Sequence, residues 1–277
     1  MKNYKKGDRV LIACITSCAT CNFCKRSMND QCKNGGWQLG HLQDGTQAEY
    51  VRISFADSCL YPVPEGVDER SLLVFSDILP TGLEIGVLRG NVIPGSTIAI
   101  VGAGPVGLAA GICAQLYSPS KLVYFDKDES RLEVAKKAGA THTYACSSAS
   151  EARELAKEHF KDVDGFDVVM EAVGVPATFE MCQELVGIGG NIANIGVHGT
   201  KVDLHIDKLW PRSVCESCCA SFAGDGVWLT RQTAISMALV SSHTIPLLLE
   251  LMQAGKLDTS MMITHGMLSS FFTTSPY

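Results

Sequence analysis

Four cysteines near the amino terminus constrain the fold of this chain more than any other feature of its sequence. Because disulfide-bonded Cα atoms must approach within about 7 Å in one orientation, cysteines at every third position pair poorly with one another. A compact loop can instead wrap four thiolates around one ion at about 2.3 Å, as in closed structural zinc sites. The alternative is a chance cluster among twelve cysteines, but this spacing predicts a zinc lobe. The predicted ligands are Cys18, Cys21, Cys24 and Cys32, spaced C-x2-C-x2-C-x7-C.

Length and charge limit the classes of protein to consider. The chain has 277 residues, of which 46% are hydrophobic, enough for two domains with substantial cores. Its net charge is −6 without a basic stripe, so nucleic acid is not an expected partner. No apolar stretch approaches the roughly 18 residues of a membrane helix, and the run Val10–Ile15 is too short for a signal peptide. We therefore expect a cytoplasmic protein with reduced thiols and no membrane contact.

A glycine-rich motif in the middle of the chain has the context of a dinucleotide-binding fingerprint. The β-branched run Thr97–Val101 precedes GAGPVG, and an apolar helical pattern follows it. Gly102 permits a tight turn, Gly104 lets the backbone approach a pyrophosphate, and Gly107 lets the helix pack closely on the strand. The free amides at the helix N-terminus then favour phosphate binding.

An aspartate after the next predicted strand strengthens this interpretation. Asp126 follows the strand Lys121–Phe125, 19 residues beyond Gly107. A carboxylate at this position can accept hydrogen bonds from ribose hydroxyls and repels a 2′-phosphate, which favours NAD over NADP. The alternative is that Asp126 caps the helix that begins near Asp128.

Strands and helices continue to alternate after Asp126, which predicts an α/β fold with a doubly wound parallel sheet. Gly174, just after one of these strands, is expected at the carboxyl edge where such sheets hold their ligand. The further predicted strands are Thr141–Ala145, Phe166–Glu171, Asn191–Val197 and Ile235–Val240. The predicted helices are Ser130–Ala138, Ser150–Phe160 and Thr178–Val186.

A cysteine-rich lobe ahead of a Rossmann unit resembles the zinc-containing alcohol dehydrogenases of the medium-chain dehydrogenase/reductase superfamily. The resemblance runs from the first residues to about Trp210 and resumes from about Ile235 to His265. Besides the four cysteines and the GAGPVG motif, it rests on GDRV at 7–10, DGTQAEYV at 44–51, YPVPEG at 61–66 and SDILPTG at 76–82.

This resemblance implies hydride exchange between NAD and an alcohol or its carbonyl, on a GroES-like catalytic domain joined to a Rossmann domain. It also implies a second, catalytic zinc that binds the substrate oxygen, with Asp77 as one ligand. The alternative for Asp77 is an N-cap on the helix that begins near Ile78. Homo-oligomerisation is implied as well. The implied cofactor-binding residues are Gly102, Gly104, Pro105, Val106, Gly107, Asp126, Arg131 and Gly174.

The chain departs from this family at three places. The family takes its other catalytic-zinc ligands from an early cysteine and a Gly-His-Glu stretch, and none of the seven histidines here is followed by glutamate. About twenty residues, Val214–Thr233, are inserted with the cluster Cys215, Cys218 and Cys219, and the end GMLSSFFTTSPY resembles nothing in the family. We therefore expect an N-terminally truncated member whose own turnover is impaired, because a catalytic zinc needs three protein ligands.

The expected organisation is a partial GroES-like domain with the zinc lobe at 1–78, a NAD-binding Rossmann domain at 79–240 and a truncated return segment at 241–277. A rival hypothesis is a non-catalytic NAD- and zinc-binding fragment or regulatory subunit. A quinone-reductase-like relative is disfavoured, because such relatives lack the four-cysteine lobe.

Overall fold

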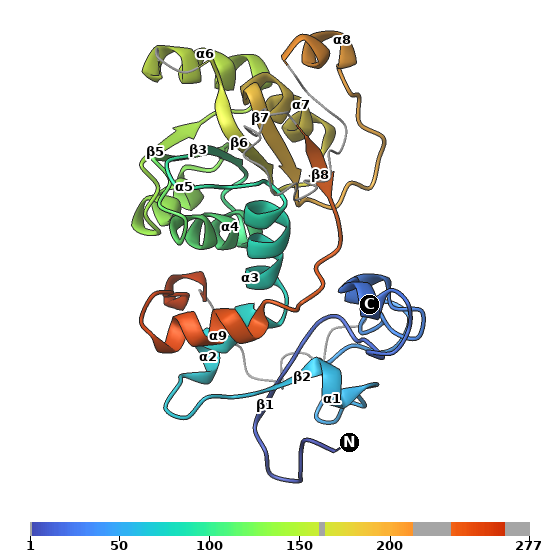
Figure 1. The fold of residues 1–277 in the computed structure, drawn as a ribbon. Helices are drawn as coiled ribbons and strands as arrows, with labels where there is room; N and C mark the ends of the chain where they lie inside the picture. Colours follow the sequence, from blue (N-terminus) through green and yellow to red (C-terminus); the bar gives the residue numbers. More distant parts are fainter. Residues whose placement is uncertain (1, 161–163, 213–233, 264–277) are drawn as a thin grey trace, which may run out of the picture.

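A six-stranded parallel sheet forms the larger half of the molecule (Figure 1). The structure is a computed structural model that describes residues 2–160, 164–212 and 234–263. The strand order is β5-β4-β3-β6-β7-β8, so the order reverses direction between β3 and β6. The strands are β3 (Thr97–Val101), β4 (Lys121–Asp126), β5 (His142–Ala145), β6 (Phe166–Glu171), β7 (Val186–Asn194) and β8 (Ile235–Met237).

Helices cover both faces of this sheet because its strands are apolar on both sides. Successive residues of a strand point to opposite faces: Ile98 and Ile100 pack on one side, Ala99 and Val101 on the other. The first face is covered by α4 (Pro105–Gln115) and α5 (Glu129–Lys137), and the second by α6 (Ala149–His159) and α7 (Pro176–Leu185). The predicted doubly wound α/β fold is confirmed.

The ends of two helices are fixed by side-chain caps that the sequence supplies. The Asp128 carboxylate accepts the backbone N–H of Ser130 at the start of α5, and the Ser148 hydroxyl accepts that of Glu151 at the start of α6. Such caps satisfy amides that have no partner inside the helix. The residue that caps α5 is therefore Asp128, and the alternative cap by Asp126 is wrong.

Most predicted element boundaries lie within two residues of the observed ones, and β7 is the main exception. It was expected at Asn191–Val197 and spans Val186–Asn194. Its pairing with β6 shifts register between Phe166 and Val168, which lets the glycine-rich start of β7 join the sheet. It ends early because the amides of Ile195 and Gly196 both donate to the Glu171 carbonyl oxygen.

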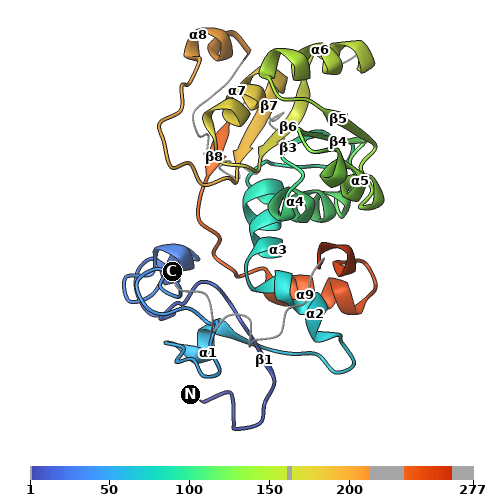
Figure 2. The same cartoon turned by 180° about the vertical axis from the view of Figure 1, so that it is seen from behind.

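The smaller half carries the cysteine lobe and a two-stranded antiparallel sheet of β1 (Val10–Ile12) and β2 (Leu60–Pro62). A chain of short helices joins it to the parallel sheet, and α9 (Ile245–Gln253) returns beside α2 (Figure 2). The joining helices are α2 (Glu69–Leu72), η3 (Leu73–Ser76), α3 (Ile78–Thr81) and η4 (Gly82–Leu88). The other short helices are η1 (Cys24–Arg26), η2 (Asn29–Gln31) and α1 (Ala56–Cys59) before β2, α8 (Ile206–Leu209) and η5 (Trp210–Arg212) after β7, and η6 (Ser260–Met262) after α9.

Within the described ranges, no single helix is long and apolar enough to cross a membrane. One bent pair, Glu69–Ser76 with Ile78–Leu88, meets the length and composition criteria together. The predicted insertion Val214–Thr233, with Cys215, Cys218 and Cys219, and the atypical carboxyl-terminal segment lie outside the described residues.

A substitution at Gly111 in α4 tests how tightly this helix packs on the sheet. A Cβ at Gly111 would overlap the hydroxyl of Tyr124, which is 1% exposed and donates to the Gly107 carbonyl oxygen at 3.1 Å. We expect Gly111→Ala to lower the free energy of unfolding by about 2 kcal/mol, because overpacking outweighs the gain in helix propensity. Chemical denaturation measures this. The matched control is Gly199→Ala, where the added Cβ meets no atom within 4 Å; equal effects of the two variants would contradict the packing argument.

Candidate cofactor crevice and metal lobe

The glycine-rich turn lies where the strand order reverses, between the carboxyl ends of β3 and β6. Ligands of open α/β sheets bind in the crevice at such a switch point. Gly102 has φ +105°, a conformation that favours glycine, and a Cβ on Gly107 would overlap the Gly102 carbonyl oxygen. Gly104 is the N-cap of α4 and its side-chain position is open. Each glycine therefore has the steric setting that the fingerprint requires.

The Asp126 carboxylate faces this turn from the end of β4. Its Oδ2 accepts the backbone N–H of Ala103 at 2.6 Å, and its Oδ1 accepts the N–H of Asp128 at 2.9 Å. Asp126 therefore connects β4 to the glycine turn, a contact that the sequence analysis did not foresee. Each carboxylate oxygen keeps a further lone pair that a ligand hydroxyl can use.

The other predicted cofactor residues surround the same edge of the sheet. Pro105 and Val106 open α4, and the Arg131 guanidinium lies 4.0 Å from the position that a Cβ on Gly104 would take. Arg131 also contacts the Asp128 carboxylate at 3.7 Å. Gly174 follows β6 with φ +90°, and its side-chain position is closed by the backbone of Val197. The structure thus brings the predicted set together, and its cofactor role remains a prediction.

The sequence analysis did not identify two residues at this edge, Glu171 and His198. Glu171 ends β6 with 0% of its surface exposed, and its carboxylate lies 3.3 Å from the Nε2 atom of His198. The available signal was an acid directly after the apolar residues VVM of the run FDVVME and directly before a glycine-containing turn. A carboxylate that is buried at that position needs hydrogen-bond donors around it.

The four predicted zinc ligands lie together. Their sulfur atoms all fall within 4.8 Å of one another, and none of the four cysteines forms a disulfide. Four sulfurs at 2.3 Å around a tetrahedral ion lie about 3.8 Å apart, so this donor set fits zinc. Among the described residues, this is the only group of three or more potential ligands within such distances.

Hydrogen bonds and burial give the thiols of this lobe different pKa values. Donation from Thr20, and also from Asn34, lowers the pKa of the Cys18 thiol to about 5. Burial, together with the neighbouring Cys21 and Cys32 sulfurs, raises the pKa of Cys24 to about 12. A metal ion has to displace the Cys24 proton, so binding releases protons and is favoured by higher pH.

Asp77 lies exposed at the start of α3. Its Oδ1 accepts the Thr81 hydroxyl at 2.9 Å, and its side chain accepts no backbone N–H, so it does not cap the helix. Burial, and then the Asp77 charge, raises the pKa of the nearby Cys14 thiol to about 12. Asp77 belongs to no group of three potential metal ligands in the described ranges. The catalytic-zinc role of Asp77 therefore stays a prediction.

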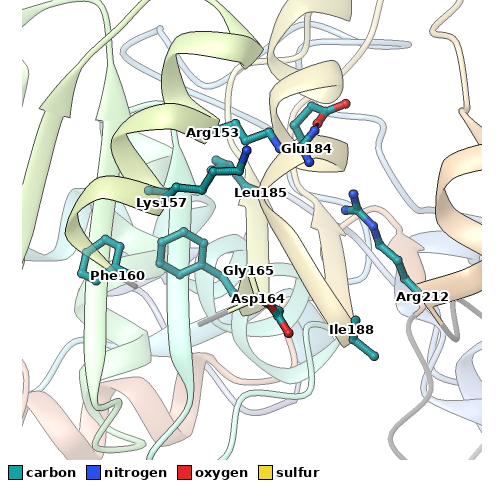
Figure 3. Close-up of a pocket in the computed structure, with 11 residues that line it drawn as sticks. Arg153, Lys157, Phe160, Asp164, Gly165, Glu184, Leu185, Ile188 and Arg212 are labelled. Atoms are coloured by element: carbon teal, nitrogen blue, oxygen red, sulfur yellow. Dashed lines mark hydrogen bonds and ion pairs between the residues drawn. The ribbon is translucent and has the colours of Figure 1, made fainter. Parts of the chain in front are cut away.

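A cavity of about 350 Å³ lies at the opposite edge of the sheet, at the amino end of β6 (Figure 3). Its cations already have partners within the protein. Arg153 binds Glu184 at 2.6 Å, Lys157 binds Glu154 at 3.3 Å, and Arg212 donates to two backbone carbonyl oxygens. This cavity is distinct from the crevice at the glycine turn.

A Rossmann-type sheet with a dinucleotide fingerprint, preceded by a thiolate metal lobe, defines a nucleotide-binding α/β protein of the dehydrogenase class. The zinc-binding dehydrogenase family model matches residues 105–253, and the model of the alcohol dehydrogenase GroES-like domain matches residues 1–65. The chain belongs to the zinc-binding dehydrogenase family of medium-chain alcohol dehydrogenases, as its motifs predicted.

Named relatives agree with this assignment. The chain is 35% identical over 208 residues to "Zinc-type alcohol dehydrogenase B" of Aspergillus flavus, covering 73% of this chain and 48% of that protein. It is similar in structure to zinc dependent alcohol dehydrogenase 2 from Streptococcus pneumonia, with a TM-score of 0.80, 42% identity and coverage of 92% and 67%. Alcohol dehydrogenase TADH from Thermus sp. ATN1 gives a TM-score of 0.78, 28% identity and coverage of 94% and 72%. The chain spans about half the length of the curated relatives it matches.

Substitution of one lobe cysteine tests the metal site. We expect Cys32→Ser to lose about one equivalent of zinc per chain and to lower the unfolding temperature, because a closed site needs all four ligands. Metal analysis of the purified protein and thermal unfolding with and without a chelator measure both effects. The control is Cys146→Ala, a buried thiol of the parallel-sheet half; equal zinc content in the Cys32 variant and the unmodified chain would rule out the lobe as the site.

Proposed function

We propose that this chain is an NAD-linked oxidoreductase of the zinc alcohol dehydrogenase family, which exchanges a hydride with a small primary or secondary alcohol or its carbonyl, and that its turnover is impaired because the described residues group too few catalytic-zinc ligands. The observation that carries the proposal is the glycine turn at the β3–β6 switch point, with Asp126 directed at it. The family assignment and the names of the relatives support the substrate class.

The proposed cofactor contacts follow from this geometry. The turn at Gly102–Gly107 would carry the pyrophosphate, because the first amides of α4 have no partner inside the helix and α4 directs its positive dipole end there. Arg131 would add a cation beside Gly104. Asp126 would accept hydrogen bonds from the adenosine ribose. The nicotinamide, when bound, accepts or donates the hydride; the protein holds and orients it.

Among the described residues, one group of potential zinc ligands lies together, the four lobe cysteines, and this donor set fits a structural site. Four thiolates would complete the shell of a tetrahedral ion and would leave no open position for substrate. Asp77 supplies one carboxylate with no second and third ligand grouped around it in the described part of the chain. The described residues therefore support no catalytic step through a zinc ion.

The four lobe cysteines together with a single carboxylate at Asp77 favour a second candidate function. In it, the chain binds NAD and zinc without turning over alcohols. Both candidates include a cytoplasmic location. The nine described cysteines are all free thiols, which is typical of proteins in a reducing compartment. Self-association into a homo-oligomer belongs to the same proposal, as the family resemblance implies.

The preference for NAD over NADP tests the role of Asp126. We expect the unmodified chain to bind NAD at least about tenfold more tightly than NADP, because a carboxylate repels the 2′-phosphate. Asp126→Asn keeps an acceptor for the Ala103 N–H and removes the charge, so the preference should shrink severalfold. Calorimetric titration with each dinucleotide measures this, with Asp44→Ala on an exposed loop as control. Tighter binding of NADP to the unmodified chain would overturn the assignment.

An alcohol-oxidation assay separates the two candidate functions. Because no second and third zinc ligand are grouped with Asp77 in the described part of the chain, we expect NAD binding with very low turnover. A catalytic zinc contributes several kcal/mol, so the rate should be about a thousandfold or more below that of a complete zinc enzyme. NADH formation from primary and secondary alcohols is followed with zinc supplied, and the Thermus sp. ATN1 enzyme is the positive control. Robust turnover that a chelator abolishes would refute the non-catalytic candidate.

A further inference from the structure

A buried carboxylate shapes the turn beside the glycine fingerprint. Glu171 ends β6 and pairs in register with Val101, the last residue of β3. Its Oε1 accepts the backbone N–H groups of Val173 and Gly174 at 3.0 and 2.9 Å, and the Thr178 hydroxyl at 2.6 Å. A buried charge is tolerated only when such donors surround it. Glu171 therefore fixes the backbone between β6 and α7.

That turn lies directly against the glycine turn. The Val173 Cγ2 atom lies 2.5 Å from the position that a Cβ on Gly102 would take, so it packs directly on the first fingerprint glycine. On the other side, Gly174 lies against the backbone of Val197, after β7. A Cβ on Gly196 would overlap the Glu171 carboxylate. Displacement of the Glu171 side chain would therefore move both the turn after β6 and the loop after β7.

His198 holds the second oxygen of this carboxylate. Its Nε2 lies 2.9 Å from the Asn194 Oδ1 and 3.3 Å from the Glu171 Oε2. The Asn194 amide nitrogen donates to the Gly196 carbonyl, which directs Oδ1 to the histidine. Two acceptors face Nε2, so this nitrogen carries the proton. The Nδ1 atom is buried and has no partner among the described residues.

We propose that His198 is a positioning residue for the nicotinamide half of the cofactor crevice, an inference that rests on the proposed NAD binding. A dinucleotide crosses the switch point with one half on each side. Asp126 on β4 fixes the adenosine side, so the nicotinamide side lies over β6 and β7, where Glu171 and His198 set the loops. His198 acts through Glu171 and Asn194.

The experiment compares two ligands that differ by the nicotinamide half. NAD spans the switch point, whereas ADP carries only the adenosine and pyrophosphate groups. We expect His198→Ala to weaken NAD binding about tenfold, the loss typical of a hydrogen bond to a charged group, and to change ADP binding less than about twofold. His198→Gln, which places an N–H donor near the Nε2 position, should recover most of the NAD affinity. Calorimetry gives the affinities, and thermal unfolding is measured for every variant.

The matched control is His205→Ala. His205 also pairs its Nε2 with a glutamate, Glu180, but it lies ahead of α8 and away from the glycine turn. We expect this variant to leave both affinities unchanged. Equal losses of NAD and ADP binding in His198→Ala, or no recovery in His198→Gln, would overturn the positioning role. An unmodified chain that binds neither ligand would overturn the proposed function itself, and this inference with it.

Discussion

The parallel pairing of β3 with β6 joins the two halves of the central sheet, and the candidate crevice depends on it. Val101 and Glu171 are register partners at the carboxyl ends of these strands. The glycine turn follows one strand and the Glu171-anchored turn follows the other, so the two turns lie side by side. Because Val173 packs on Gly102, a side chain at Gly102 would push these turns apart. The glycine fingerprint and the buried glutamate thus serve one geometric requirement.

A second set of contacts ties the cysteine lobe to the segment after β8. Glu84 of η4 is buried and accepts the backbone N–H groups of Ser241 and Thr244 at 2.7 and 3.1 Å. The Ser241 hydroxyl donates to Asp30, which lies between the third and fourth lobe cysteines. Tyr61 of β2 donates to the carbonyl oxygen of Ser242. The lobe is therefore bonded to the chain segment that leads from the parallel sheet into α9.

Features carried by local sequence were predictable, and those carried by distant contacts were not. The strands Thr97–Val101 and Phe166–Glu171 were predicted with their observed bounds because each is a short apolar run with clear ends. The zinc lobe followed from cysteine spacing alone. The start of β7 was missed because glycines weaken the strand pattern and a register shift admits them. The Glu171–His198 contact joins residues 27 positions apart, so no local pattern could reveal it.

The position of bound NAD tests the crevice most directly. In a crystal structure of the chain with NAD, we expect the pyrophosphate at the N–H groups of Gly104, Val106 and Gly107 and the adenosine ribose at Asp126. The nicotinamide should lie against the turn at Val173 and the adjoining loop at Val197. A dinucleotide bound instead in the cavity beside Arg153 and Arg212, at the other edge of the sheet, would contradict this assignment.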